Sequence, residues 1–409
     1  MTSIQKSQRP PARPSYILRG HISQIHALRF IRHNSRLISG DADGWLVIWK
    51  LNTMRPSAVW RAHASAILGL ETWGTDCIIS HGRDGALRIW QLKPEDEDTF
   101  STALPVEDVD HRKQPWLLHS LPVNALNFCA FSLCANSTRS SDSSGPPPAL
   151  IAVPGTKDGE ALIYALPSED AKHRVPPARS GQTGMLMALR LLRTGGTLHL
   201  LTGHESGLTA VQRLDSKMRS WATVYAATPH SQPVLSIDVA RGLGRWYTSA
   251  ADSVIAAHPL PLTLGGEESE PRKVVRTGHA GQQGLAVRSD GRVVATAGWD
   301  GKARVYSAKT LGELAVLKWH KEGCYALAFA DILEEEDERE DSGIGIADVG
   351  PREEGEGRNG ELLAPRSEEL GMAASRLETT SKRREDKMRR THWLAAGSKD
   401  GKVSLWDIY

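Results

Sequence analysis

Short runs of alternating apolar and polar residues, separated by turn residues, recur along the chain. Residues 27–30 read Ala-Leu-Arg-Phe, and Arg-Leu-Ile follows at residues 36–38. This is the two-residue period of a β-strand, whereas an amphipathic helix repeats its apolar residues every three to four positions. Because turn residues break the runs at short intervals, we predict an all-β fold built from many short strands.

One pattern recurs with a fixed internal spacing, an Asp-Gly turn followed by an aromatic residue six positions after the aspartate. An Asp-Gly pair suits a two-residue hairpin turn. Five copies are complete: Asp43-Gly44 with Trp49, Asp84-Gly85 with Trp90, Asp158-Gly159 with Tyr164, Asp300-Gly301 with Tyr306, and Asp400-Gly401 with Trp406. Two weaker copies are Asp252 with His258 and Ser206-Gly207 with Gln212. The chain therefore contains seven repeats.

The spacing of the repeats predicts two insertions. Successive copies are 41, 74, 48, 46, 48 and 100 residues apart. Four of these intervals lie near the roughly 40–45 residues of one blade of a β-propeller. We place the insertions at residues 132–148, which are rich in serine and proline, and at residues 331–390, which are charged and nearly free of aromatics. Both insertions and the N-terminal tail at residues 1–15 are predicted to be disordered.

A second element, a Gly-His or similar pair followed by an alternating run, precedes the turn in most repeats. The clearest copies are residues 19–30, 61–73, 277–287 and 318–329, and looser copies are residues 119–128 and 229–239. Before the first copy, Tyr16–Leu18 form a short strand, while the chain ends directly after the last tryptophan segment. The last repeat thus lacks its outer strand, and we expect Tyr16–Leu18 to supply it and close the ring.

Together these elements resemble the WD-repeat β-propeller family. The resemblance implies one seven-bladed propeller in which a buried network of histidine, serine or threonine, aspartate and tryptophan ties the strands of each blade. A buried aspartate needs donors, which histidine and an indole N–H can supply. The residues that match are His21, Ser39, Asp43 and Trp49 in blade one, His63, Ser80, Asp84 and Trp90 in blade two, Asp158 in blade three, His279, Thr296 and Asp300 in blade six with Tyr306 replacing tryptophan, and Asp400 and Trp406 in blade seven. Blade four departs most, so we expect its network to be incomplete.

Composition and charge narrow the range of functions. The 50 basic and 48 acidic residues nearly balance, so the chain shows no overall preference for nucleic acid or a membrane. The four cysteines lack a paired metal-ligand spacing, which favours reduced cysteines over a zinc site. We find no secretory signal and no apolar run of the roughly 18 residues that span a bilayer. We therefore expect a soluble protein of the cytosol or nucleus.

The repeated aspartates and histidines invite a catalytic interpretation, but a structural role explains them better. They recur in successive repeats at the same offsets, whereas an active site would occur once. The chain contains no nucleophile elbow, no phosphate-binding loop and no zinc-protease motif. We therefore predict a non-enzymatic protein without cofactor or metal. An enzyme with a site in the central channel is the least favoured hypothesis.

Protein binding is the positive alternative, because a propeller presents loops on two faces. The residue before each repeat aspartate lies at a hairpin tip, and all tips should share one face. Tryptophan is enriched at interface hot spots, which singles out Trp299 at a tip and Trp45 directly after the first turn glycine. Packing on a neighbouring blade is the alternative for Trp299. Simple solvation is the alternative for the charged tips Arg83, Lys157 and Lys399.

The end of the second insertion is strongly basic. Residues 382–390 read Lys-Arg-Arg-Glu-Asp-Lys-Met-Arg-Arg, which fits a nuclear localisation signal. A solvated, partly helical run is the alternative. Without interleaved aromatic residues, direct binding of nucleic acid is not expected.

A closer resemblance lies within the WD-repeat family. Residues 14–30, 36–51, 62–73 and 394–409 are similar to a fungal group of proteins associated with the ASTRA complex. That complex groups a large phosphatidylinositol-kinase-related cofactor, its co-chaperones and RuvB-like ATPases. The resemblance implies a scaffold of the nucleus, with the cytoplasm as a second location, that serves chromatin remodelling and the maturation of those kinases. A propeller that recruits substrates to a ubiquitin ligase is the alternative function.

Overall fold

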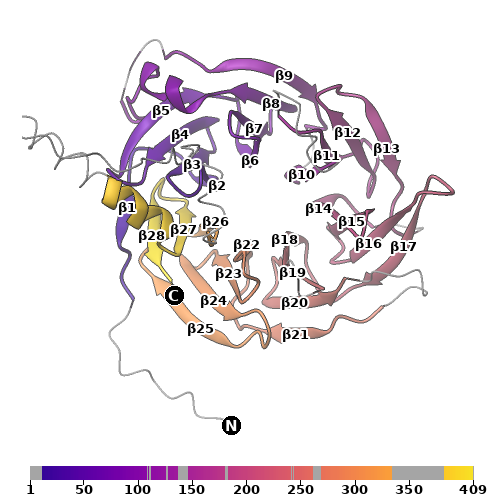
Figure 1. Ribbon diagram of the computed structural model, residues 1–409. Helices are drawn as coiled ribbons and strands as arrows, with labels where there is room; N and C mark the ends of the chain where they lie inside the picture. The colour runs from indigo at the N-terminus through magenta and orange to yellow at the C-terminus, as the bar shows by residue number, and fades with distance from the viewer. Residues whose placement is uncertain are drawn as a thin grey trace, which may run out of the picture.

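The computed structural model describes residues 12–107, 109, 112–125, 128–136, 146–179, 183–240, 242, 244–260, 269–333 and 382–408. Within these residues, seven four-stranded antiparallel sheets are arranged as blades around a central axis (Figure 1). The predicted all-β, seven-bladed propeller is therefore confirmed. In each blade the first strand lies nearest the axis and the fourth lies at the rim.

The first four blades follow one another along the chain. Blade one contains β2 (Ile25–Ile31), β3 (Arg36–Asp41), β4 (Trp45–Lys50) and β5 (Arg55–Arg61). Blade two contains β6 (Ile67–Trp73), β7 (Cys77–Gly82), β8 (Ala86–Gln91), the short 3₁₀ helix η1 (Pro94–Thr99) and β9 (Trp116–Pro122). Blade three contains β10 (Ser132–Ala135), β11 (Ala149–Pro154), β12 (Ala161–Leu166) and β13 (Ala171–Val175). Blade four contains β14 (Leu186–Thr194), β15 (Thr197–His204), β16 (Thr209–Asp215) and β17 (Ser220–Ala227).

The remaining blades complete the ring. Blade five contains β18 (Val234–Ala240), β19 (Arg245–Ala250), β20 (Val254–Pro259) and β21 (Lys273–Arg276). Blade six contains β22 (Gln282–Val287), β23 (Val293–Gly298), β24 (Lys302–Ser307) and β25 (Glu313–Lys318). Blade seven contains β26 (Cys324–Phe329), β27 (Trp393–Ser398), β28 (Val403–Asp407) and, from the other end of the chain, β1 (Tyr16–Leu18).

The ring closes through the N-terminal strand, as predicted. Strand β1 pairs antiparallel with β28, with Tyr16 opposite Leu405 and Leu18 opposite Val403. The first and last blades are thereby held by a shared sheet, so unfolding of one end of the chain exposes the edge of the other.

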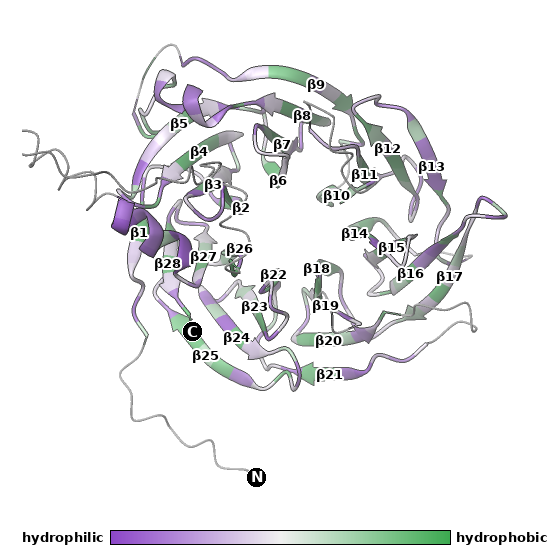
Figure 2. Ribbon diagram, in the orientation of Figure 1, coloured by the Kyte–Doolittle hydropathy of each residue, from purple (hydrophilic) through white to green (hydrophobic). Residues whose placement is uncertain are grey.

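The core consists of seven layers between consecutive blades. Between blades one and two, for example, Trp60, Ile67 and Trp90 are at least 97 % buried, and the two indole rings meet edge to face. Gly40 on β3 permits this approach, because a Cβ there would lie 2.8 Å from Ile67 Cγ2. In Figure 2 the strands of the blades carry hydrophobic segments, and the helix beside β1, residues 382–390, is strongly hydrophilic.

The Asp-Gly turn and the Gly-His pair, separate in sequence, meet in space across neighbouring blades. Gly44 has a φ of +83°, and a Cβ there would lie 2.0 Å from the carbonyl oxygen of His63 in blade two. The Gly44 carbonyl accepts the backbone N–H groups of Ala62 and His63 at 2.8 and 3.2 Å. Turn glycines also lie against the carbonyl of the next blade's histidine in blades four, six and seven. The glycine thus serves both the turn and the contact between blades.

Parts of both predicted insertions are ordered elements. Residues 132–135 form β10 because they pair along their whole length with β11, so the start of the first insertion was predicted wrongly. Residues 119–122, expected together with residues 123–128 to begin blade three, instead belong to β9, the outer strand of blade two. Residues 382–390 form a helix rather than a disordered run. Residues 1–11, 137–145 and 334–381 lie outside the described residues.

A single buried side chain holds both ends of the second insertion. Asn34, which is 2 % exposed, donates through Nδ2 to the carbonyls of Asp331 (2.7 Å) and Arg389 (3.1 Å). Its Oδ1 accepts the Asp331 backbone N–H at 3.0 Å. The Arg389 side chain returns a hydrogen bond to the carbonyl of His33 at 3.3 Å. The basic helix 382–390 is therefore docked onto blade one.

Candidate interaction surfaces

Blade two contains the complete four-residue network expected from the sequence. His63 lies between Asp84 and Ser80, with Nδ1 2.9 Å from Asp84 Oδ1 and Nε2 2.8 Å from Ser80 Oγ. Trp90 donates its indole N–H to the same Ser80 oxygen at 2.8 Å. Because an indole only donates, Ser80 Oγ is the acceptor of the Trp90 bond. The chain of hydrogen bonds ties the loop before β6 to β7 and β8.

The negative charge of Asp84 is stabilised by hydrogen bonds within the network. Burial opposes ionisation of Asp84, but hydrogen bonds from Arg88, His63 and the Ala64 backbone N–H outweigh it and lower the Asp84 pKa to about 2. Burial lowers the pKa of His63 despite its contact with Asp84. The neutral imidazole and the ionised carboxylate are therefore the stable pair near neutral pH.

Blade one has a network of the same shape, but its acid is Asp41 and not the predicted Asp43. His21 Nδ1 lies 2.7 Å from Asp41 Oδ2 and its Nε2 lies 2.7 Å from Ser39 Oγ, which also accepts the Trp49 indole N–H at 2.8 Å. Asp41 is fully buried, whereas Asp43 is exposed and accepts a hydrogen bond from Ser23.

The residue at one strand position decides which aspartate reaches the histidine. Blade two has Gly82 where blade one has Asp41, and a Cβ on Gly82 would lie 2.2 Å from His63 Nδ1 and 2.7 Å from Asp84 Oδ1. The missing side chain leaves room for Asp84 to fold back from the turn. In blade one the Asp41 side chain occupies that space itself, so the prediction of Asp43 is corrected.

Blade five carries a fuller network than its weak sequence pattern suggested. His230 contacts Asp252 Oδ1 at 3.3 Å and Thr248 Oγ1 at 2.7 Å, and His258 takes the place of the tryptophan with Nε2 2.8 Å from the same Thr248 oxygen. The second nitrogen of His258 bonds the Tyr225 hydroxyl of blade four at 2.7 Å. Burial holds the pKa of His258 well below its usual value, so this imidazole stays neutral.

Blade six replaces the histidine with an arginine. His279 is exposed and its Nδ1 lies 4.0 Å from Asp300, outside hydrogen-bond range. The guanidinium of Arg304, only 2 % exposed, instead donates to both Asp300 oxygens at 3.1 and 2.7 Å. Hydrogen bonds and charge from Arg304 and Lys302 outweigh burial and lower the Asp300 pKa to about 2. Thr296 Oγ1 and Tyr306 OH form no hydrogen bond within the described residues, so the predicted His279–Thr296 tether is wrong.

In blade seven the hydroxyl group of the network comes from the strand next to the one that supplies it in blades one and two. Ser404 on β28 lies opposite Ala396, and Ala396 occupies the position of Ser39 and Ser80. Ser404 Oγ is 2.9 Å from His320 Nε2 and accepts the Trp406 indole N–H at 2.9 Å. Asp400 lies 3.4 Å from His320 Nδ1. Asp400 and Trp406 therefore belong to one network, closed through a serine that the sequence pattern did not indicate.

Blades three and four lack this network in the described part of the chain. Asp158 is exposed, so its predicted role in a buried tether is wrong, and the buried acid is Glu160, which pairs with Arg174 at 2.8 Å. In blade four His204 has no aspartate partner within the described residues and bonds Thr202 at 3.1 Å, and Ser206 is exposed where other blades place aspartate. The incomplete network expected in blade four matches this arrangement.

The hairpin tips share one face, here called the tip face, because all seven sheets have the same strand order and direction. In six blades the tip residue donates its backbone N–H to the loop before its own innermost strand, as Trp299 does to Gly281 at 2.9 Å. Lys157 and Lys399 are exposed tips. Arg83 is also exposed, but its guanidinium lies 4.3 Å from the centre of the Phe128 ring.

The two candidate tryptophans of the tip face differ in exposure. Trp299 is 48 % exposed, and its indole N–H donates to Gln283 at 2.9 Å while its ring covers Gly281. Trp45 is half-buried against the core of blades one and seven, and the Arg112 guanidinium covers its ring at 4.5 Å from the centroid. Of the two tryptophans, Trp299 is therefore open to a partner and Trp45 is not.

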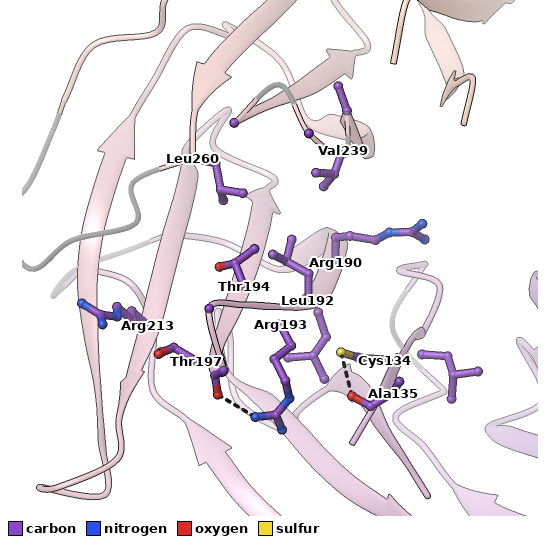
Figure 3. A pocket seen from close by; sticks show the side chains of 17 residues that line it. Cys134, Ala135, Arg190, Leu192, Arg193, Thr194, Thr197, Arg213, Val239 and Leu260 are labelled. Carbon is purple, nitrogen blue, oxygen red and sulfur yellow. Dashed lines mark hydrogen bonds between the residues drawn. The ribbon is translucent and has the colours of Figure 1, made fainter. Parts of the chain in front are cut away.

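The opposite face holds a pocket of about 980 Å³ between blades three, four and five (Figure 3). Blade four projects here, because β14 has nine residues and the other innermost strands have four to seven. Leu192, Val239 and Leu260 line the pocket with Arg190, Arg193 and Arg213. In Figure 3 Arg190 and Arg213 lie on opposite sides of Leu192. The sequence patterns did not indicate this site.

Comparisons with known proteins agree with the fold and define the family. The WD domain, G-beta repeat family matches residues 12–50, 272–307 and 389–407. ASTRA-associated protein 1 of Verticillium alfalfae is 46 % identical over 100 % of this chain and 96 % of its own length. The chain belongs to the ASTRA-associated protein 1 family. Family members from Penicillium rubens and Schizosaccharomyces pombe are 44 % and 34 % identical over 98 % and 77 % of the chain, and over 98 % and 93 % of their own lengths.

The WD matches of this family member cover blades one, six and seven, whereas the networks of blades two and five lie outside them. The described residues contain no group of three or more histidine, cysteine, aspartate or glutamate side chains placed to hold a metal ion. A helix able to cross a membrane is not found in that same part of the chain. In blades one, two, five and seven the networks are hydrogen-bonded tethers between strands.

Proposed function

We propose that the protein is a non-enzymatic scaffold subunit of the ASTRA complex. In this role it serves chromatin remodelling and the maturation of phosphatidylinositol-kinase-related proteins together with their co-chaperones and RuvB-like ATPases, in the nucleus. The observation that carries the proposal is the full-length similarity to proteins named ASTRA-associated protein 1. The fold supports it, because the residues that recur in the blades form buried tethers and leave the loops of two faces for partners.

Affinity purification of the full chain from its own cells tests this proposal. We expect the kinase-related cofactor, the co-chaperones and the RuvB-like ATPases to be recovered together. Recovery of a ubiquitin-ligase adaptor without any of these would favour the substrate-receptor alternative. Recovery of neither set would overturn the scaffold role in this complex.

Trp299 is our proposed contact on the tip face. Its ring is half exposed and held by Gly281 and Gln283, so a partner would bury it at little cost in side-chain entropy. We expect Trp299→Ala to reduce recovery of at least one subunit. Leu314→Ala is the matched control, because Leu314 is 61 % exposed on β25 of the same blade but lies at the rim. Equal recovery of every subunit with both variants would show that Trp299 is not part of the interface.

A further inference from the structure

We propose that the pocket between blades three, four and five binds an extended segment of a partner protein that carries one bulky apolar side chain flanked by carboxylates. This inference deepens the scaffold role and rests on it, since it names one surface by which such a scaffold would take a partner. It concerns the face opposite Trp299. It therefore adds a second binding surface and does not extend the first.

The floor of the pocket is apolar. Leu133, Leu191, Leu192, Val239 and Leu260 all line it, and they come from three different blades. Leu192 and Val239 are only partly buried although they pack against the core between blades four and five. An apolar side chain seated there would remove their remaining surface from water, which is the main source of affinity in pockets of this kind.

The rim is positively charged, although Asp238 beside the pocket pairs with one of its arginines. Three arginines line the pocket, and none of the seventeen described lining residues is aspartate or glutamate. Arg190 lies 3.4 Å from Asp238, and Arg193 donates to the carbonyl of Gly196 at 2.8 Å. The Nε atom of Arg213 is buried and has no hydrogen-bond partner within the described residues. A buried guanidinium atom without an acceptor is costly, so a carboxylate at this position would be stabilised.

The positions of the three arginines favour a peptide over a compact anion. Figure 3 shows Arg190 and Arg213 on opposite sides of the apolar residues and Arg193 on the side away from Val239. Separate carboxylates on both sides of a central apolar group would match this distribution.

Two loop glycines leave space for the main chain of such a segment. Apart from their chain neighbours, no described atom lies within 4 Å of a Cβ built on Gly195 or Gly242, which have φ values of +54° and +83°. The hairpin between β14 and β15 thus presents bare backbone at the mouth of the pocket. An approaching peptide meets no side chain at these two positions.

Fluorescence anisotropy with the full chain and defined peptides tests the inference. The probes are fluorescein-labelled Gly-Glu-Glu-X-Glu-Glu-Gly peptides in which X is Phe, Leu or Trp. The comparison peptides replace X with Ser or replace the four glutamates with lysines. We expect at least one apolar probe to bind at least tenfold more tightly than both of its comparison peptides, and higher salt to weaken that binding.

Charge-reversed variants locate the binding. Arg213→Glu is expected to weaken binding of the tightest-binding peptide at least tenfold. If this variant has a lowered melting temperature, Arg193→Glu, which alters an exposed residue, serves as the second variant. Arg55→Glu is the control, because Arg55 is exposed on blade one, far from the pocket, and should change the affinity less than twofold.

The outcomes separate the pocket from the scaffold role. The proposal of peptide binding at the pocket would be overturned by any of three results. These are no binding of the three apolar peptides, equally tight binding of the lysine peptides, or an equal loss of affinity with Arg55→Glu. Tighter binding of a ten-nucleotide single-stranded DNA than of any peptide would do the same, because the site would then be a nucleic-acid site. Failure of the wild-type chain to recover ASTRA subunits from cells would count against the scaffold role alone.

Discussion

Replacing Asp41 with alanine should destabilise the protein far more than replacing Asp43. The Asp41 carboxylate accepts hydrogen bonds from His21 Nδ1 at 2.7 Å and from the backbone N–H groups of Asp43 and Trp45 at 3.0 and 2.9 Å. Alanine removes all three acceptor contacts at once. The exposed side chain of Asp43 accepts one hydrogen bond, from the Ser23 hydroxyl.

The magnitude follows from which of the orphaned donors can reach water. The side chain of His21 is 1 % exposed, so its Nδ1–H would be left buried without an acceptor, at a cost of roughly 1–3 kcal/mol. The two turn N–H groups lie next to the exposed Asp43 and recover part of their bonding from solvent. We therefore expect Asp41→Ala to lower the free energy of unfolding by roughly 2–4 kcal/mol, while Asp43→Ala stays near the ~0.5 kcal/mol of ordinary surface substitutions.

Urea denaturation followed by tryptophan fluorescence is the assay, because Trp49 belongs to the affected network. Denaturant slopes rise with chain length and are about 3 kcal/mol per molar urea or more for chains larger than a small domain, so the Asp41→Ala midpoint should fall by about 1 M. A midpoint for Asp43→Ala as low as that for Asp41→Ala would refute the assignment of the tether to Asp41.

Three further predictions concern other contacts. Gly44→Ala should lower the free energy of unfolding in urea by roughly 2–4 kcal/mol, because a Cβ at φ +83° would lie 2.0 Å from a carbonyl oxygen. The control is Gly195→Ala, whose Cβ would have no described atom within 4 Å apart from its chain neighbours. It should lower that free energy by only the roughly 1–2 kcal/mol of a left-handed backbone. Burial, with a smaller effect of the neighbouring His63, lowers the pKa of His81 to about 4, so its contribution to stability is present above about pH 6.5 and is lost as the pH falls through 4. A His81→Gln chain whose unfolding free energy falls just as steeply between these pH values would contradict this. Asn34→Gly, which keeps the left-handed backbone but removes three hydrogen bonds, should speed tryptic cleavage within residues 382–390 several-fold, and an unchanged cleavage rate would show that Asn34 does not hold the helix.

The architecture could be predicted because its determinants are local or lie between adjacent blades. An Asp-Gly turn followed by a tryptophan is contained within two strands of one hairpin. Its glycine meets the next Gly-His pair about twenty residues later, as Gly44 meets His63. Contacts between residues so close in sequence give a pattern that repeats along the chain, and the number of repeats predicts the number of blades. Closure by Tyr16–Leu18 followed from the strand that the last blade lacked.

The identity of the tether residues was less predictable, because it depends on which side chain occupies a shared space. Spacing from Ser39 pointed to Asp43, yet an aspartate two positions earlier already filled the cavity that Gly82 leaves open in blade two. The pair of aspartates in Gly-Asp-Ala-Asp-Gly was the available clue, since blade two has glycine at the first of these positions. In blade six Arg304 filled the same space from the next strand and displaced His279.

Contacts between distant segments gave no sequence pattern at all. Asn34 binds residues about 300 and 355 positions away, and nothing around it distinguishes it from a polar turn residue. The pocket combines side chains from three blades. Its arginines are the polar residues of strands in which polar and apolar residues alternate, so nothing in the sequence marked them as a site. Such sites arise from packing of whole blades, so periodicity cannot predict them.

A partner that binds a repeat protein once must recognise what differs between the repeats. The His–Ser–Asp–Trp tethers recur in modified form in most blades, so they position the loops without selecting one of them. Blade four departs from the repeat in two respects. Like blade three, it lacks an aspartate tether, and its strands β14 and β15 extend beyond their counterparts on the face opposite the tips. That extension carries Arg193 and the bare Gly195 hairpin to the mouth of the pocket. The blade that departs most from the repeat is therefore the one where recognition of a single partner is best placed.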